Sequence, residues 1–452
     1  MTHGTMKKLS SADIVERYLS FFKQRAHVEL PGSPIAVSGN STSFIIAGMQ
    51  PLLPYLRGQE TPPAPRLTAF QRCLRTDDAG AVGSNARKLT CFHMLGNWSV
   101  GDYGKGETMT MALELLVDNF GLNVDSLWVT TFAGDASLNI SPDEYTIGEW
   151  QRLGIPPERI VPLGVEDNLW TMGGPGPCGP CTEIYVDRGV EFGCGEPTCR
   201  PGCDCDRFLE IWNLVFIEYE RLANGPLVKL PFLSIDTGMG LERMAAVMQD
   251  VTTAFDIDLF VPASTRLAEL APLPSKQSDP ARERARRIIV DHTRAALFAM
   301  LAGVLPGRDG RNSVVRRLIR RASRQGRVYG IDGPFLGQLV PPLVQAHDEL
   351  LATGERQQIP AITRMLAEEE ERFARVLTIG LRELAQLEAD ERGIVPGERI
   401  FELHAEKGFP SDLAAEILAE RGLSVDWQGY QRAEKAHHEV SRRSAQSHFG
   451  AE

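Results

Sequence analysis

The 452-residue sequence lacks a run of about 18 apolar residues, and it lacks a charged leader followed by an apolar stretch and a small-residue cleavage site. We therefore expect neither a membrane span nor a secretory signal, and we expect a cytoplasmic protein. Internal repeats and low-complexity linkers are absent as well. With 43% hydrophobic residues, a chain of this length is expected to fold into two or three globular domains.

An excess of positive charge is also missing. The net charge is −11, which argues against indiscriminate nucleic-acid binding, although a local basic patch can still hold one selected RNA. The eight cysteines are more consistent with thiols or metal ligands than with disulfides, because no secretory signal is expected.

Four of these cysteines form a compact group among turn residues. Cys194, Cys199, Cys203 and Cys205 follow a C-x4-C-x3-C-x-C spacing, and four thiolates can bind zinc tetrahedrally. The spacing differs from paired C-x2-C knuckles, so reduced thiols without a metal are the alternative. A separate C-x-x-C, Cys178 to Cys181, lies among glycines and prolines, where a rigid turn is expected rather than a redox pair.

Residues 233–248 predict a short strand, a glycine turn and a helix. Gly238 and Gly240 are expected to supply positive φ at the turn and to let a ligand approach the backbone. Arg243, in the first turn of the helix, suggests a phosphate at the helix N-terminus. Asp236 could pair with a substrate ammonium or merely cap the helix. A plain strand, turn and helix with a solvated arginine is the alternative.

A second candidate site is a pair of strands joined by a polar loop, residues 76–90. The first strand alternates so that Arg75 shares a face with Gln71, and the second strand carries Phe92. Such a pair can hold a phosphate and stack a flat base. An exposed hairpin with a solvated arginine is the alternative.

Three further segments contribute single residues. A strand over residues 43–46 ends shortly before Met49, which alone indicates core packing. Trp170 precedes a stretch, residues 173–180, whose four glycines and three prolines predict a fixed loop with exposed backbone that serves a ligand. Asn213 lies in a strand between apolar residues, and a buried asparagine needs polar partners.

From residue 252 onward the sequence is typical of helices. In the segment 314–327, Arg316, Arg320 and Arg324 recur at every fourth position, with Arg317 and Arg321 beside them. This basic stripe suggests contact with a nucleic-acid backbone. The alternative is a solvated face paired with acids such as those at 368–371. Other helices are expected over residues 10–24, 105–120, 141–153, 281–302 and 361–387.

Together these motifs resemble the N-terminal aminoacylation half of alanyl-tRNA synthetases, which are class II aminoacyl-tRNA synthetases. The resemblance covers nearly the whole chain in the family's order. It is carried by Gln71–Arg75, Met94–Tyr103, Gly176–Ile184, Glu210–Phe216 and Asp236–Arg243, and in the helical part by Asp291–Ala295, Val315–Arg324 and Gly408–Leu413.

The resemblance implies an α+β fold. Residues 1–250 would form a class II catalytic domain, a six-stranded antiparallel sheet flanked by helices, and residues 251–452 a mostly helical tRNA-recognition domain. The implied enzyme uses ATP and Mg²⁺ to activate L-alanine to alanyl-adenylate, and then transfers the alanyl group to tRNA(Ala).

The family pattern also implies residue roles. Arg75 would bind the α-phosphate and the alanine carboxylate, Phe92 would stack on adenine, Gly240 and Arg243 would meet the distal phosphates, and Asp236 would bind the ammonium. The amino-acid pocket would be bounded by Met49, Trp170, Asn213 and Gly238. The acceptor would be bound by Arg316, Arg317, Arg320, Arg321, Arg324 and Asp412. A methyl-sized pocket separates glycine from alanine by only ~1–3 kcal/mol, so editing is expected in this family.

The chain ends before the family's editing and C-terminal domains, which leads us to expect a short paralogue and a monomer. Several departures fall largely where the acceptor would enter: a shortened loop at 76–90, Arg87-Lys-Leu for Arg-His-His, His93 for glutamate, Gly174-Pro for Asp-Thr, Ile46 for asparagine and a missing asparagine at 307–311. One alternative is therefore a paralogue that transfers alanine to a small-molecule amine or nucleoside. Another is a non-catalytic regulator that binds RNA or a synthetase, against which the intact Arg75, Asp236 and Arg243 argue.

Overall fold

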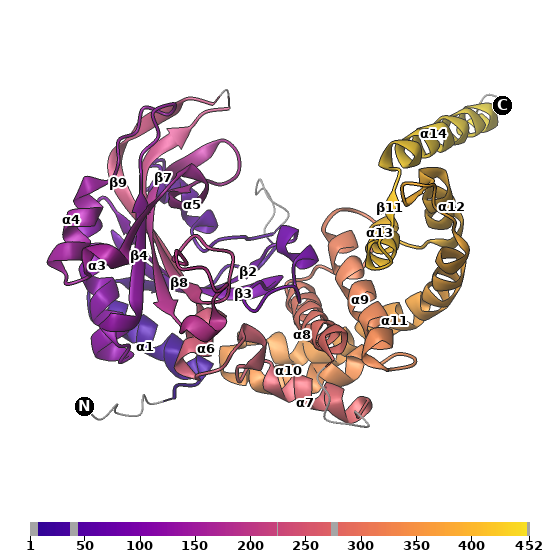
Figure 1. The fold of residues 1–452 in the computed structure, drawn as a ribbon, viewed down its shortest axis with the longest axis horizontal. Coiled ribbons are helices and arrows are strands. Elements are labelled where there is room, and N and C mark those ends of the chain that lie inside the picture. Colours follow the sequence, from indigo (N-terminus) through magenta and orange to yellow (C-terminus); the bar gives the residue numbers. More distant parts are fainter. Residues whose placement is uncertain (1–7, 37–43, 224, 273–278, 450–452) are drawn as a thin grey trace.

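The computed structural model describes residues 8–36, 44–223, 225–272 and 279–449. Figure 1 shows an α+β part built around one large sheet, followed by a helical part that ends in a projecting arm formed by α12, α13 and α14. Within the described residues, no helix combines the length and the apolar character needed to cross a membrane.

The sheet contains the predicted antiparallel strands. Its strand order is β1-β2-β3-β9-β8-β7-β4-β5, with β6 paired to β7. The six strands from β2 to β4 in this order are mutually antiparallel, and β1 and β5 add in parallel at the two edges. The α+β class and the six-stranded antiparallel sheet are thus confirmed. The strands are β1 (Val28–Leu30), β2 (Arg66–Leu74), β3 (Cys91–Val100), β4 (Leu127–Phe132), β5 (Ile160–Leu163), β6 (Leu169–Trp170), β7 (Gly176–Asp187), β8 (Phe208–Arg221) and β9 (Leu227–Gly240).

Helices pack on the sheet through apolar faces. In α1, Tyr18 and Phe22 are buried against Trp212 of β8, with ring centroids 5.6 and 6.4 Å apart. The helix starts at a capping box in which Ser10 and Asp13 bond each other's backbone N–H groups. The helices of this part are α1 (Ser11–Lys23), α2 (Leu53–Leu56), α3 (Lys105–Glu114), α4 (Glu144–Arg152), α5 (Val165–Asn168) and α6 (Leu241–Met248).

The helical part shares its core with the sheet. One apolar cluster runs from Phe22 and Trp212 to Leu297 of α8 and Leu366 of α11, whereas a smaller cluster around Phe409 joins the second half of α11 to α12 and α13. The elements here are α7 (Val261–Leu270), α8 (Pro280–Leu301), α9 (Gly310–Tyr329), α10 (Val340–Ala346), α11 (Glu355–Gln386), α12 (Gly397–Lys407), α13 (Ser411–Glu420), α14 (Trp427–Phe449), β10 (Ile394–Val395) and β11 (Ser424–Val425). Short 3-10 or π turns are η1 (Gln50–Leu52), η2 (Asp77–Gly80), η3 (Leu115–Asn119), η4 (Val124–Ser126), η5 (Pro157–Arg159), η6 (Val190–Phe192), η7 (Ala254–Asp256), η8 (Leu336–Leu339) and η9 (Asp348–Leu350).

The predicted glycine turn at Gly238 and Gly240 is wrong. Strand β9 continues through both residues because β3 and β8 flank it and keep it extended. Gly240, with φ −75°, is the residue before α6, and Gly238 is likewise outside the positive-φ set. A Cβ at 238 would lie 2.8 Å from the Sδ of Met94, so glycine leaves room for that side chain beside the strand.

The predicted exposed loop at residues 173–180 is also wrong from Gly176 onward. Residues 176–181 are buried in β7. A Cβ on Gly179 would lie 1.8 Å from the carbonyl oxygen of Phe216, so glycine lets β7 approach β8 at an irregularity in the ladder.

Several element boundaries differ from expectation, since α11 begins at Glu355 and α3 ends at Glu114. Residue 43 lies outside the described residues, and residues 44–46 form no strand, although the backbone N–H of Ile45 donates to Ile35 and its carbonyl oxygen accepts from Leu74. The helix expected from residue 141 begins at Glu144, because the carboxylate of Asp143 caps it by accepting from the backbone N–H of Thr146.

Candidate active site

A cavity of about 630 Å³ opens on the sheet, where the β2–β3 loop, β7, β8, β9 and the start of α6 meet. Eight of the nine residues predicted to contact ATP or alanine line it: Arg75, Phe92, Trp170, Asn213, Asp236, Gly238, Gly240 and Arg243. The ninth, Met49, is fully buried in an apolar cluster with Trp98 and is not part of the lining. Ala47 and Met94 line the cavity on that side instead.

Asp236 presents a buried carboxylate to this cavity. It is 6% exposed, and its Oδ1 accepts a hydrogen bond of 2.6 Å from the indole Nε1–H of Trp98, the facing residue on β3. Within the described chain no cation pairs with it. Burial raises the pKa of Asp236 to about 7, in spite of the indole hydrogen bond. A carboxylate in such a place is stabilised by a bound ammonium group.

Arg75 presents the opposite charge. Its Nε–H donates to the carbonyl oxygen of Ile46 at 3.0 Å, and its Cζ lies 4.9 Å from the ring centroid of Phe92. No acidic side chain of the described residues forms an ion pair with Arg75. The guanidinium is therefore held by a backbone oxygen and an aromatic face, and its charge remains available to an anion.

A second arginine is close to two carboxylates that the sequence analysis did not select. Arg243 donates through Nη1 to Glu210 Oε2 at 2.6 Å. Glu183 accepts from Asn213 Nδ2 at 2.9 Å and from the Tyr185 hydroxyl at 2.6 Å. Burial, reinforced by Glu210, raises the pKa of Glu183 to about 8. Both acids belong to motifs quoted above, and their oxygen atoms suit a hard cation such as Mg²⁺.

The start of α6 is fixed from behind by a buried polar cluster. His93 lies on the opposite face of β3 from Phe92 and is fully buried. The carboxylate of Glu242 accepts from His93 Nδ1 at 2.9 Å, from the His93 backbone N–H at 3.0 Å and from Arg294 of α8 at 2.8 Å. Burial alone would raise the pKa of Glu242, but Arg294 and His93 lower it to about 2. This cluster holds the helix that carries Arg243 against β3.

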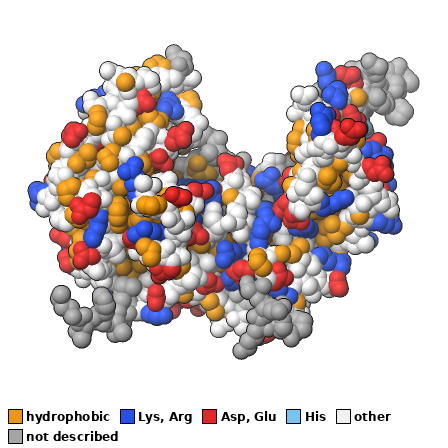
Figure 2. All heavy atoms as spheres, in the orientation of Figure 1, with side chains coloured by type: hydrophobic (Ala, Val, Ile, Leu, Met, Phe, Trp, Pro, Cys, Tyr) orange, Lys and Arg blue, Asp and Glu red, His pale blue; other side chains and the backbone are white. Residues whose placement is uncertain are grey.

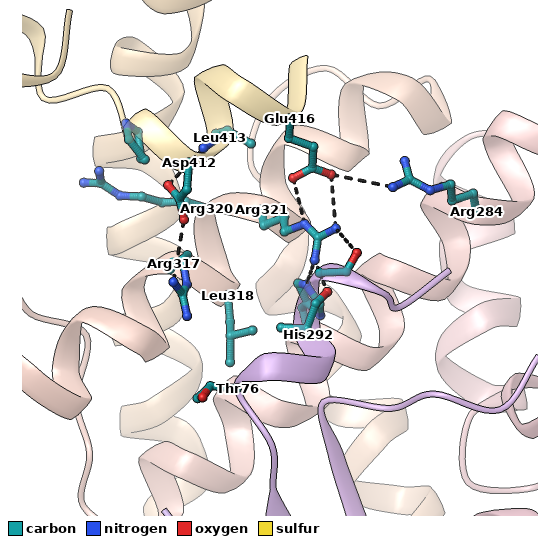
Figure 3. A pocket seen from close by; sticks show the side chains of 13 residues that line it. Thr76, Arg284, His292, Arg317, Leu318, Arg320, Arg321, Asp412, Leu413 and Glu416 are labelled. Carbon is teal, nitrogen blue, oxygen red and sulfur yellow. Dashed lines mark hydrogen bonds and ion pairs between the residues drawn. The ribbon is translucent and has the colours of Figure 1, made fainter. Parts of the chain in front are cut away.

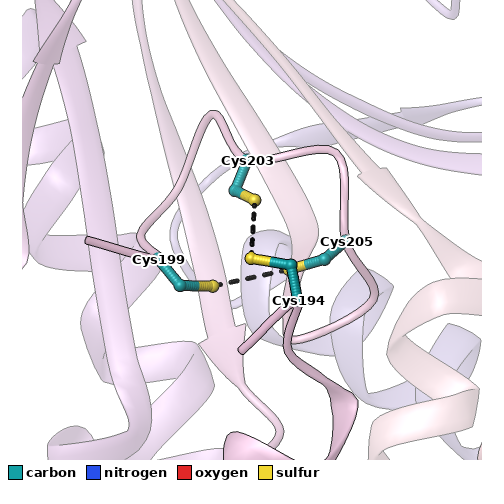
Figure 4. A group of neighbouring side chains, drawn as sticks. All are labelled: Cys194, Cys199, Cys203 and Cys205. Atoms are coloured by element: carbon teal, nitrogen blue, oxygen red, sulfur yellow. Dashed lines mark hydrogen bonds between the residues drawn. The ribbon is translucent and has the colours of Figure 1, made fainter. Parts of the chain in front are cut away.

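The four clustered cysteines lie in the connection between β7 and β8. Figure 4 shows their sulfur atoms converging, and all four Sγ atoms lie within 4.8 Å of one another. The closest pairs, Cys199 with Cys205 and Cys194 with Cys203, are 3.5 and 3.6 Å apart. Tetrahedral thiolates with Zn–S bonds of ~2.3 Å would be roughly 3.8 Å apart, so the group fits zinc.

The cysteine segment also supports the wall of the cavity that contains Arg87. Arg87, which lines the cavity, donates to the carbonyl oxygen of Cys205 at 3.1 Å and to the carboxylate of Asp204 at 2.6 Å. The segment thereby positions the β2–β3 loop beside Arg75.

The predicted basic stripe on α9 is not an open surface. Figure 2 shows a hollow between the α+β part and the projecting arm, with Lys and Arg side chains gathered near its floor. Each of the five predicted arginines lies within ion-pair distance of an acid, although Arg317 stays exposed: Arg316 and Arg320 with Glu369, Arg317 with Asp412, Arg321 with Glu416 and Arg324 with Glu420. Three of them, Arg320, Arg321 and Arg324, are 6 to 8% exposed. The pairing with acids agrees with the alternative given in the sequence analysis. Acceptor binding by these residues remains a prediction.

Comparison with known proteins adds three findings. An alanine–tRNA ligase of Thermoanaerobacter sp. (strain X514) is 42% identical over 435 residues, which is 94% of this chain and 48% of that protein. An alanine–tRNA ligase of Acetivibrio thermocellus is 40% identical over 456 residues, 99% of this chain and 50% of that protein. Among solved structures, apo S. aureus histidyl-tRNA synthetase matches with a TM-score of 0.32 and 14% identity, over 56% of this chain and 71% of that one.

The chain spans about half the length of the curated relatives it matches. The family model described as tRNA synthetases class II (A) matches residues 13–451, which is almost all of it. The chain therefore belongs to the class II (A) family of tRNA synthetases.

Proposed function

We propose that this chain uses ATP to activate L-alanine to alanyl-adenylate and transfers the alanyl group to tRNA(Ala), as the names of its relatives suggest. The observation that carries the proposal is the pair of uncompensated charges in one cavity: the buried carboxylate of Asp236 and the guanidinium of Arg75. Asp236 and Gly240 are four positions apart on an extended strand, roughly 14 Å, which is room for an amino acid joined to a nucleotide phosphate.

The proposed reaction assigns a role to each of these positions. A carboxylate oxygen of alanine attacks the α-phosphorus, and the bond from that phosphorus to the bridging oxygen breaks, so that pyrophosphate leaves with the electron pair. Asp236 orients the ammonium, Arg75 binds the negative oxygens around the α-phosphorus, and Arg243 binds the leaving pyrophosphate. No protein nucleophile is needed. Glu183 and Glu210 would hold Mg²⁺, which when bound neutralises phosphate charge.

Alanine-dependent exchange of pyrophosphate into ATP tests the first step. The purified chain is expected to catalyse exchange with alanine and more weakly with glycine and serine. No exchange with any amino acid would exclude an activating enzyme. Charging of tRNA(Ala) tests the second step. Normal exchange without charged tRNA would overturn the proposed acceptor and favour a small-molecule amine.

Alanine binding should depend on pH through Asp236. Below its raised pKa of about 7 this carboxyl group is protonated in the free protein, so alanine must displace a proton to pair its ammonium. The KM for alanine in the exchange reaction is expected to fall up to tenfold per unit from about pH 5.5 to about pH 7 and then to level off. The D236N variant should lose this slope. A KM for alanine that does not change over this range would contradict the assigned role.

Zinc binding by the four cysteines is proposed to hold the Arg87 side of the cavity. The purified chain should contain about one zinc per molecule by elemental analysis. The Cys205→Ser variant is expected to lose that metal, to melt at a lower temperature and to show a several-fold higher KM for ATP, because Arg87 loses its support. The Cys178→Ala variant alters a cysteine of β7 outside the cluster and should retain zinc. If the purified wild-type protein contains no zinc, the four cysteines are reduced thiols without a metal, and the zinc proposal is wrong.

A further inference from the structure

The β2–β3 loop, residues 75–90, is a wall shared by two cavities. Asp78, Arg87 and Lys88 of the loop line the candidate active site. Thr76, Ala79 and Gly80 line a second cavity, of about 320 Å³, whose other walls belong to α8, α9 and α13. A change in the second cavity that moves the loop therefore also changes the lining of the candidate active site.

Arg321 of α9 joins the loop to α13. Its guanidinium donates through Nη1 to the carbonyl oxygen of Ala79 and through Nη2 to that of Gly80 at 3.3 Å. The same group binds the carboxylate of Glu416 on α13, with N···O distances of 2.9 and 3.1 Å. Figure 3 shows Arg321 between Glu416 above and the loop below. Arg321 is 8% exposed, so these bonds are largely shielded from water.

The far end of the loop is tied to the same network. The backbone N–H of Thr90 donates to Asp291 Oδ1 at 2.9 Å, and Asp291 Oδ2 lies 2.8 Å from His292 Nδ1. His292 Nε2 lies 3.1 Å from Arg321 Nη1. Because arginine can only donate, Nε2 accepts this bond and Nδ1 carries the proton toward Asp291. The network therefore holds the loop that carries Asp78 and Arg87 at two places, residues 79–80 and its end at Thr90.

We propose that Arg321 and Glu416 are positioning residues that couple α13 to ATP binding. Glu416 orients the guanidinium, and the guanidinium fixes the backbone at Ala79 and Gly80, which sets the place of the loop in the active-site cavity. Asp412, one turn earlier on α13, lines the same second cavity. A group that enters this cavity and competes for Arg321 or Glu416 changes the affinity for ATP. The inference rests on the proposed function, since it takes ATP as the ligand of the first cavity.

The test compares Arg321→Lys and Glu416→Gln in the exchange reaction. Lysine keeps the charge but cannot bind both loop carbonyls and the carboxylate. Each variant is expected to raise the KM for ATP about five- to tenfold, with kcat and the KM for alanine within about twofold of wild type. The double variant should resemble the single ones, because the two residues act as one unit. Isothermal titration with ATP gives the same comparison without turnover.

The matched control is Arg286→Lys. Arg286 of α8 also binds carboxylates, Asp256 at 2.8 Å and Glu283 at 2.7 Å, and a backbone carbonyl, Phe255 at 3.3 Å, but it touches neither cavity. The Arg286→Lys substitution is expected to lower the melting temperature and to leave the KM for ATP unchanged. An unchanged KM for ATP in Glu416→Gln, or an equal rise in Arg286→Lys, would overturn the coupling. Absence of exchange in wild-type protein would overturn the proposed function instead, and titration of ATP into Glu416→Gln would then decide the coupling.

Discussion

The Asp236→Asn variant is expected to lose alanine-dependent exchange by about 100- to 1,000-fold in kcat/KM for alanine, and at the same time to be more stable than wild type above about pH 7. The loss of activity follows from the missing counter-charge for the ammonium in a buried site. Losing one member of a buried charge pair typically costs about 2–5 kcal/mol. Exchange kinetics at saturating ATP measure this effect.

The gain in stability follows from the sign of the pKa shift. The folded-state pKa of Asp236 is about 7, above its ordinary value of 3.8, so the folded protein binds this proton more tightly than the unfolded chain. The resulting penalty is absent at about pH 4, grows as the pH rises and is complete above about pH 7. A pKa difference of about three units corresponds to at most about 4 kcal/mol in the free energy of unfolding. We expect thermal melting to show a gain in stability of about 1–3 kcal/mol for the variant. Asparagine can still accept from Trp98, so the indole remains satisfied.

A matched acid elsewhere should respond in the opposite direction. Asp143 caps α4 and pairs with Lys105 at 2.8 Å, and it lies outside both cavities. Asp143→Asn is expected to lower stability by about 0.5–1.5 kcal/mol and to leave exchange unchanged. If Asp236→Asn were destabilised like Asp143→Asn and still exchanged alanine, the carboxylate would be a structural group and not the ammonium site.

The alternation of residues 71–75 places Arg75 and Arg72 on opposite faces, and the predicted pairing of Arg75 with Phe92 agrees with the structure, where both line one cavity. Strand geometry fixes which residues share a face, and that information is local. The role of Glu183 was not accessible in this way. Its pKa is raised by burial in β7, where it lies opposite Asn213, and by the approach of Glu210, and cross-strand register is set by the whole sheet.

The glycines also show that a local sequence pattern cannot reveal contacts between residues far apart in the sequence. Gly238 and Gly240 satisfied a turn pattern, yet pairing with β3 and β8 holds both extended. The side chain that a Cβ at 238 would meet is Met94, a residue far away in sequence. Likewise, helical spacing correctly placed Arg316, Arg320 and Arg324 on one face of α9, but spacing alone could not show that acids of α11 and α13 cover that face.

Arg75→Lys is expected to lower kcat/KM for ATP by about 100-fold, and Arg75→Ala by about 1,000-fold, with little change in melting temperature. Lysine keeps the charge but loses the planar group that Ile46 and Phe92 orient. Stability should hardly change, because no ion pair of the described residues depends on Arg75. Pyrophosphate exchange at varied ATP, together with thermal melting, measures both quantities.

Arg72 supplies the control within the same strand. It lies three residues earlier, on the opposite face of β2, where it binds Glu355 through both Nη atoms, donates to the carbonyl oxygen of Leu350 at 3.0 Å and covers the ring of Phe298 at 4.4 Å. Arg72→Lys should therefore lower stability by about 1–3 kcal/mol and leave exchange within about threefold. The two arginines differ in the partner that the fold gives them, since one has a carboxylate and the other has none. Exchange by Arg75→Lys at the wild-type rate would mean that Arg75 does not bind the reacting phosphate. The proposed function would then be supported by the charge of Asp236 but no longer by that of Arg75.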